Sequence, residues 1–199
     1  MRSQTSAERQ KDQRRRLLRA AAEIFAAQGF ARANVEAIVD KAGMSRRTFY
    51  EHFTSLEDIL LQLHDRAASA AFRYVEAVVR SLDGDDPLAR LRAAVAAFLG
   101  VVAEHPDLSR VVFREVRAAG PDLEVRRDVV LGRYVTLLFE QLATAHARGL
   151  VGRPPDELTL YTLVAGAESV AMRYVSRGET ARAQEAVPTL VELLLRAFR

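Results

Sequence analysis

The chain of 199 residues contains no cysteine. This absence excludes disulfides, thiolate nucleophiles, zinc–cysteine sites and thiol redox sensing. Long apolar runs are missing as well. The longest stretch without a charged residue is about Ala93 to Ala103, far shorter than the roughly 20 residues that a membrane helix needs. Residues Met1 to Arg19 lack the apolar core of a signal peptide. We therefore expect a cytoplasmic protein with no membrane partner.

Signatures of metal binding and catalysis are also absent from the sequence. The four histidines, at positions 52, 64, 105 and 146, share no i, i+4 spacing. There is no glycine-rich phosphate loop and no nucleophile elbow, and nothing in the sequence places two carboxylates in one pocket. We expect no metal and no cofactor, and we expect that the protein is not an enzyme. A small helical enzyme stays open as an alternative that turnover would reveal.

Positive charge is concentrated near the N-terminus. Residues 1–53 carry eleven Lys and Arg against six Asp and Glu, a net charge of +5, whereas the remainder carries −2. Such an uneven distribution favours a polyanionic partner for the N-terminal part alone, although a solvated basic tail would have the same composition.

Helical periodicity extends over nearly the whole chain, and no stretch alternates with period two. Glycines and prolines punctuate this pattern, with a proline near the first turn of most later segments, where its missing N–H costs little. The sequence predicts an all-α protein of nine helices. After a first helix ending at Gly29, they are expected at 35–42, 46–52, 56–81, 87–104, 107–118, 121–148, 155–176 and 180–198.

Residues 35–53 have the layout of a helix-turn-helix. Gly43 can adopt the left-handed backbone of a tight turn, while Asn34 and Ser45 stand where N-caps are needed. Phe49 and Phe53, four residues apart, would hold the second helix on a core. The side chains that remain free to face a DNA groove are Arg46, Arg47, Thr48, Tyr50 and His52. Helical cores without DNA-binding function also contain such helix pairs.

The combination of motifs from Arg14 to Leu61 resembles the TetR/AcrR family of bacterial transcriptional regulators. The resemblance rests on Ala21 to Phe25 with Gly29-Phe30, on Val35-x-x-Ile38-x-x-x-Ala42-Gly43-Met44-Ser45, on Thr48-Phe49-Tyr50-x-His52-Phe53 and on Ser55-x-Glu57-x-x-Leu60. It implies a DNA-binding domain over residues 1–54 and a helical domain over 55–199 that binds an effector and dimerises.

The resemblance also implies which residues contact DNA. The recognition helix would be Ser45 to Phe53, with Tyr50 and His52 on phosphates and Arg46, Arg47 and Thr48 nearer to bases. The chain departs from the family pattern at Ala33, Arg47 and Leu56, where Thr, Gly and Lys are common. Arg32 is expected to bind the phosphate that Ala33, which has no hydroxyl, cannot reach. The full set of expected DNA contacts is Arg14, Arg15, Arg16, Arg32, Asn34, Ser45, Arg46, Arg47, Thr48, Tyr50 and His52.

Effector-contacting residues are predicted where aromatic or isolated polar residues interrupt an apolar helix face. These are Phe98, Arg110, Phe113, Tyr134 and Phe139. Ordinary core packing explains aromatic residues at helical spacing equally well. An apolar or aromatic effector fits this pattern, and so does no effector at all.

The last two predicted helices carry wide apolar faces that need a partner. A two-fold homodimer forming a four-helix bundle would supply one, and burial against the same chain is the alternative. The predicted interface residues are Leu158, Tyr161, Ala165, Met172, Val187, Leu190, Val191 and Leu194.

Together these features predict a one-component transcriptional regulator. We expect a homodimeric repressor that binds double-stranded DNA at a palindromic operator and that an unidentified small-molecule effector releases. The runner-up is an effector-independent DNA-organising protein with the same DNA-binding part.

Overall fold

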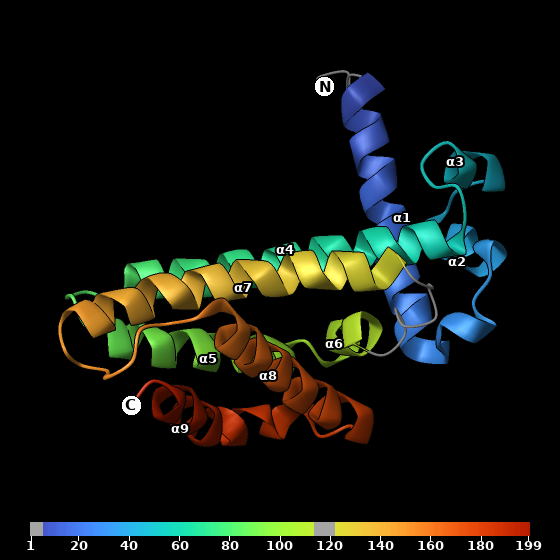
Figure 1. Ribbon diagram of the computed structural model, residues 1–199. Helices are drawn as coiled ribbons and strands as arrows, with labels where there is room; N and C mark the ends of the chain where they lie inside the picture. The colour runs from blue at the N-terminus through green and yellow to red at the C-terminus, as the bar shows by residue number, and fades with distance from the viewer. Residues whose placement is uncertain (1–5, 114–121) are drawn as a thin grey trace.

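The computed structural model describes residues 6–113 and 122–199, and every regular element in these ranges is helical (Figure 1). The predicted all-α fold is therefore confirmed. The elements are α1 (Ser6–Gln28), η1 (Phe30–Arg32), α2 (Val35–Ala42), α3 (Arg46–Tyr50), α4 (Leu56–Ser81), α5 (Pro87–Glu104), α6 (Pro106–Phe113), α7 (Asp122–Ala147), α8 (Glu157–Arg177), η3 (Thr180–Ala186) and α9 (Val187–Ala197).

The helices form a small head and a larger body that share α4. Figure 1 shows α1, α2 and α3 gathered at one end of α4, with the N-terminal part of α1 projecting beyond the bundle. Helices α5 and α7 pack along the remainder of α4, α8 packs mainly on α7, and α9 packs mainly on α5. The short α6 lies between the body and the end of α1.

Capping side chains mark most of the predicted helix starts. Ser55 accepts a hydrogen bond from the Asp58 N–H at 3.1 Å and so begins α4, while Asp86 accepts from the backbone of α5 before Pro87. These oxygens satisfy N–H groups that have no partner within the helix, which is why short polar side chains at these positions predict the boundaries well.

Three expected helices differ from the observed elements. The helix expected at 46–52 already ends at Tyr50. The helix expected at 180–198 is divided into the 3₁₀ segment η3 and α9, because Pro188 in the first turn of α9 has no N–H to continue an α-helix from η3. The helix expected at 155–176 starts at Glu157 with Asp156 as its N-cap. Of the helix expected at 107–118, residues 114–118 lie outside the described residues.

Two main hydrophobic clusters lie along the molecule. The first joins the head helices through residues such as Leu17, Phe25 and Phe49, and it continues along α4 to Leu63. The second fills the body between the far end of α4, α5, α7, α8 and α9. Because α4 contributes to both clusters, the domain boundary at 54/55 stays a prediction.

Candidate DNA-binding and effector sites

The helix-turn-helix is held in shape by local backbone chemistry. The Asn34 side chain accepts from the Ala37 N–H at 2.8 Å, and Ser45 accepts from the Thr48 N–H at 3.1 Å. Between them Gly43 has a φ of 62°, a left-handed conformation that a side chain would penalise. The turn therefore sets the angle at which α3 leaves α2.

Two aromatic rings anchor α3 and decide which of its faces is free. Phe49 and Phe53 are fully buried in the head cluster, with their ring centroids 5.6 Å apart. Arg46, Arg47 and Tyr50 are exposed as a result. The outer surface of α3 is thus basic and can donate hydrogen bonds.

Each arginine of α3 is paired with a carboxylate of the head. Arg46 Nη1 lies 3.1 Å from Glu36 on α2, and a hydrogen bond with Tyr50 is the main reason why the pKa of Arg46 is raised. Arg47 Nε lies 3.2 Å from Glu51.

The three arginines expected in a basic arm lie within α1, and their surroundings differ. Arg16 donates to the Ala42 carbonyl at 2.6 Å, at the end of α2. The Arg14 guanidinium lies 5.7 Å from the centre of the Phe53 ring and donates to Gln62. These two arginines therefore tie α1 to the other head helices. All three residues are exposed, and Arg15 pairs with its helix neighbour Asp12 at 2.6 Å.

The remaining predicted DNA contacts also have local partners. Arg32 Nε donates to the Gln28 carbonyl at 2.8 Å, and the Thr48 hydroxyl lies 3.0 Å from that of Ser45. The half-buried His52 ring lies 3.3 Å from Gln13 of α1. All of these side chains are in the head, and their roles in DNA binding stay predictions.

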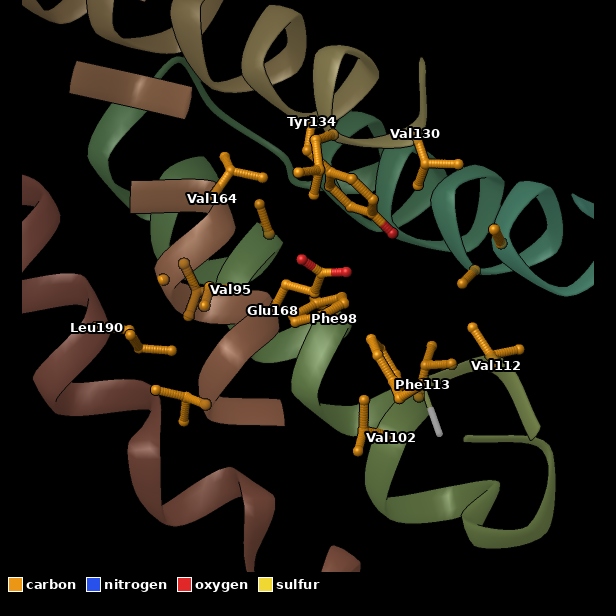
Figure 2. A pocket seen from close by; sticks show the side chains of 18 of the residues that line it. Val95, Phe98, Val102, Val112, Phe113, Val130, Tyr134, Val164, Glu168 and Leu190 are labelled. Carbon is orange, nitrogen blue, oxygen red and sulfur yellow. The ribbon is translucent and has the colours of Figure 1, made fainter. Parts of the chain in front are cut away.

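The body contains a cavity of about 310 Å³ between α4, α5, α6, α7, α8 and α9. Its wall is dominated by alanine, valine, leucine and phenylalanine, as Figure 2 shows for Val95, Phe98 and Val102. The volume lies at the lower end of the range of about 300–1,000 Å³ that small-molecule sites occupy.

Tyr134 brings a hydroxyl into this apolar space. Its ring packs edge-on against Phe72 and Phe98, at centroid distances of 5.2 and 5.7 Å, and its hydroxyl points into the cavity (Figure 2). Burial raises the pKa of this phenol well above its usual range, so the group is neutral. Within residues 6–113 and 122–199 the hydroxyl has no hydrogen-bond partner and is therefore available to a ligand.

The charged groups in the cavity wall neutralise each other. Arg127 Nε donates to both Glu168 oxygens, at 3.0 and 2.8 Å, and Arg127 Nη2 lies 2.5 Å from the same carboxylate. This hydrogen bonding is the main reason why the pKa of Arg127 is raised. His64 is buried, and the loss of solvation lowers its pKa. The cavity accordingly presents an apolar surface without net charge from these groups.

Three of the five predicted effector contacts, Phe98, Phe113 and Tyr134, line the cavity. The other two lie elsewhere: Arg110 Nη1 donates to the Ala26 carbonyl at 3.1 Å, and Phe139 is exposed on α7. Sequence reasoning missed His64, Arg127 and Glu168. An ionisable residue on an otherwise apolar helix face would have been the signal, but the pairing of α7 with α8 cannot be read from the sequence.

Family models match most of the chain. The model for bacterial regulatory proteins of the tetR family matches residues 17–63, and the model for the tetracyclin repressor-like C-terminal domain matches residues 84–198. The chain belongs to the TetR family of transcriptional regulators. Members of this family bind DNA and act as dimers.

Solved structures of TetR-family regulators share the whole fold. The fatty acid degradation regulator FadR from Bacillus halodurans superimposes with a TM-score of 0.80 at 21% identity, covering 100% of this chain and 99% of FadR. FadR from Bacillus subtilis, solved in complex with stearoyl-CoA, has a TM-score of 0.79 at 19% identity, covering 93% of this chain and 99% of FadR.

Curated relatives match over shorter stretches. The transcriptional activator FasR from Mycolicibacterium smegmatis is 28% identical over 134 residues, which span 67% of this chain and 60% of FasR. The regulator TcmR from Streptomyces glaucescens is 35% identical over 94 residues, 46% of this chain and 39% of TcmR. The chain thus spans roughly half the length of the curated relatives it matches.

In this TetR-family chain, α6 contributes to both the head and the cavity. Val111 is fully buried in the head cluster, and Arg110 bonds to the end of α1. The adjacent Val112 and Phe113 line the cavity (Figure 2). Any change of the cavity wall at α6 therefore acts on a helix that is packed into the DNA-binding head.

The predicted dimer residues differ widely in exposure. Leu158 is 76% exposed at the start of α8, whereas Leu194 is only 3% exposed and lines the cavity within its own chain. Val191 is buried too, and the half-buried Tyr161 donates to Asp128 at 2.7 Å. Ala165, Met172, Val187 and Leu190 are half-buried.

Neither a membrane span nor a metal site is found in the parts of the chain that the structure describes. No helix there is both long and apolar enough to cross a membrane. In the same residues, no group of three or more His, Asp or Glu side chains is arranged to hold a metal ion.

Proposed function

We propose that the protein is a homodimeric repressor that an apolar small molecule releases from a palindromic operator. The observation that carries the proposal is the double role of α6, which has Val111 in the head core and Phe113 on the cavity wall. An effector that favours a shifted α6 would move the end of α1, and with it the head, in each protomer. Differential affinity for the two arrangements is what makes such a molecule an effector.

The exposed face of α3 supports a role in reading DNA. An α-helix fits the major groove, where an arginine can donate two hydrogen bonds to guanine O6 and N7. Arg46 and Arg47 are assigned to bases, whereas Tyr50 and Arg15 are assigned to phosphates. Arg14 and Arg16 each donate one hydrogen bond within the head and so also hold α1 in place, and the other N–H donors of these exposed residues are assigned to phosphates.

The cavity supports an apolar effector with one hydrogen-bonding group. Its wall offers carbon atoms and the free Tyr134 hydroxyl, while Arg127 and Glu168 neutralise each other. The fold shared with the FadR that was solved with stearoyl-CoA suggests a long-chain acyl-CoA as the first compound to test. The acyl chain would occupy the cavity, and the Tyr134 hydroxyl would donate to its thioester oxygen.

The DNA-binding part is tested by selecting duplexes from random oligonucleotides, followed by gel shifts over a range of salt concentrations. Arg46→Ala is expected to cost about 1–3 kcal/mol and to relax the preference at one base pair. Arg15→Ala should weaken all sequences alike and reduce the salt slope by about one unit. If the wild-type protein prefers no duplex, the proposed function is wrong.

The effector part is tested by titrating stearoyl-CoA into the protein–operator complex, with coenzyme A alone as the control. Release by the acyl form only is expected. Phe98→Ala, in the cavity wall, should change the concentration needed, whereas Phe139→Ala, on the outer face of α7, should not. A protein that binds many sites and is released by no ligand would instead be an effector-independent DNA-organising protein. Activation of the adjacent promoter would exclude a repressor.

The dimer is tested at Leu158 because Leu194 belongs to the interior of its own chain. Leu158→Glu places a charge on an exposed surface of α8 and should shift the sedimenting mass from dimer to monomer without loss of helicity. An unchanged dimer mass would show that the interface lies elsewhere.

A further inference from the structure

The two arginines of α3 are held by carboxylates through different nitrogen atoms. Glu36 accepts from Arg46 Nη1 with both of its oxygens, at 3.1 and 3.4 Å. Glu51 accepts from Arg47 Nε at 3.2 Å. The first pair occupies an outer nitrogen of the guanidinium, and the second occupies the inner one.

Of these two arginines, only Arg47 therefore has both terminal nitrogens, Nη1 and Nη2, free of a carboxylate; we call this pair of nitrogens the Arg47 fork. Its side chain is 89% exposed, and neither Nη1 nor Nη2 has a partner within residues 6–113 and 122–199. A guanidinium carries its N–H donors in one rigid plane, so a bond at Nε fixes the direction in which Nη1 and Nη2 point. Two parallel donors in that arrangement match guanine O6 and N7.

We propose that Glu51 determines sequence specificity by positioning the Arg47 fork for one guanine. The inference rests on the proposed function, in which α3 enters the major groove. Without Glu51, the long Arg47 side chain would sample many rotamers and could also reach nearby phosphates, which are the same in every sequence. The Glu51 carboxylate also repels phosphates, so it disfavours binding to unselected DNA.

A role in helix stability is a weaker explanation of the same ion pair. Arg47 precedes Glu51 by four residues, the less favourable order for such a pair on a helix. Both side chains are more than half exposed, so solvent screens the attraction. Moreover, Glu51 is the C-cap of a helix of only five residues, and α3 is held in place by its buried aromatic rings.

Glu36 provides a matched control for Glu51. Glu51→Ala and Glu36→Ala each remove one negative charge from the helix-turn-helix, but only the first frees the Nε of Arg47. Affinities are measured for the duplex that the wild-type protein selects, for that duplex with each G·C pair changed singly to A·T, and for a random duplex.

For Glu51→Ala we expect tighter binding to random DNA. The ratio of the affinity for the selected duplex to that for the random duplex should fall roughly tenfold, mainly because the preference at one G·C pair is lost. Glu36→Ala should tighten binding to both duplexes and change the preference at that G·C pair less than twofold, because Arg47 keeps its bond to Glu51. Glu51→Gln lacks the charge but keeps an oxygen acceptor, so it should retain more of the ratio than Glu51→Ala. Arg47→Lys should lose the preference at the same G·C pair, because a single ammonium has no fork.

A ratio for Glu51→Ala that stays within twofold of the wild type overturns the inference, as does an equal loss of preference at the same G·C pair for Glu36→Ala. Thermal melts of both variants verify that the head remains folded. The proposed function fails in a different way, namely when the wild-type protein itself selects no duplex, and that result overturns both proposals.

Discussion

Adjacent valines on α6 should have separate effects, because they face different parts of the molecule. Val111 is fully buried in the head cluster, whereas Val112 lies half-buried on the wall of the cavity. Val111→Ala removes two buried carbon groups from the head. At about 0.8 kcal/mol per CH₂ and with a further term for the space left behind, the unfolding free energy should fall by about 2–2.5 kcal/mol.

Val112→Ala removes the same atoms from a wall that already faces empty space. These atoms have fewer packed neighbours there, so the cost should stay below about 1 kcal/mol. For a chain of this size, about 1 kcal/mol corresponds to roughly 2–4 °C in Tm. Far-ultraviolet circular dichroism should then show Tm lowered by about 4–10 °C for Val111→Ala and by less than about 4 °C for Val112→Ala.

The two variants should also differ in function. Val112→Ala changes the cavity and should alter the affinity for stearoyl-CoA, whereas Val111→Ala should reduce the effect of bound stearoyl-CoA on operator affinity. Equal losses of Tm, or a larger loss for Val112→Ala, would refute the assignment of α6 to both the head core and the cavity wall.

Three further predictions concern single side chains. Arg16→Ala removes a hydrogen bond to the last carbonyl of α2 and should lower Tm by about 2–4 °C, while Arg15→Ala, on the solvent side of α1, should leave Tm unchanged. Burial lowers the pKa of His64 despite the neighbouring Asp65, so the unfolded chain takes up the proton more readily. Stability should therefore fall as pH drops below about 6.5, and urea titrations of His64→Gln should lack this dependence. Tyr134→Phe should keep the wild-type Tm and weaken stearoyl-CoA binding about five- to tenfold in a fluorescence titration; unchanged affinity would rule out a hydrogen bond from this hydroxyl.

Local chemistry made the head predictable from the sequence. The caps at Asn34 and Ser45 bond to backbone N–H groups only three residues away, and Gly43 is needed by the backbone of a single turn. The spacing of Phe49 and Phe53 places both rings on one face of a short helix, whatever the body of the protein looks like. Interactions of this range depend on neighbouring residues, so one chain is sufficient to predict them.

The functional surfaces required the tertiary structure. Arg14 and Arg16, which are predicted to contact DNA, each also donate a hydrogen bond within the head, to Gln62 and to the end of α2, which the fold brings next to α1. Leu194 was expected at a dimer interface, yet it lies against the cavity of its own chain.

The sequence by itself determined the helical class, most helix boundaries and the family, because periodicity, caps and motifs are properties of short segments. Only the tertiary structure decided that Glu168 neutralises Arg127 and that Arg110 bonds to the end of α1. It also decided that α6 packs into the head core and lines the cavity. Such contacts join residues that are distant along the chain, and their partners are set by how whole helices pack.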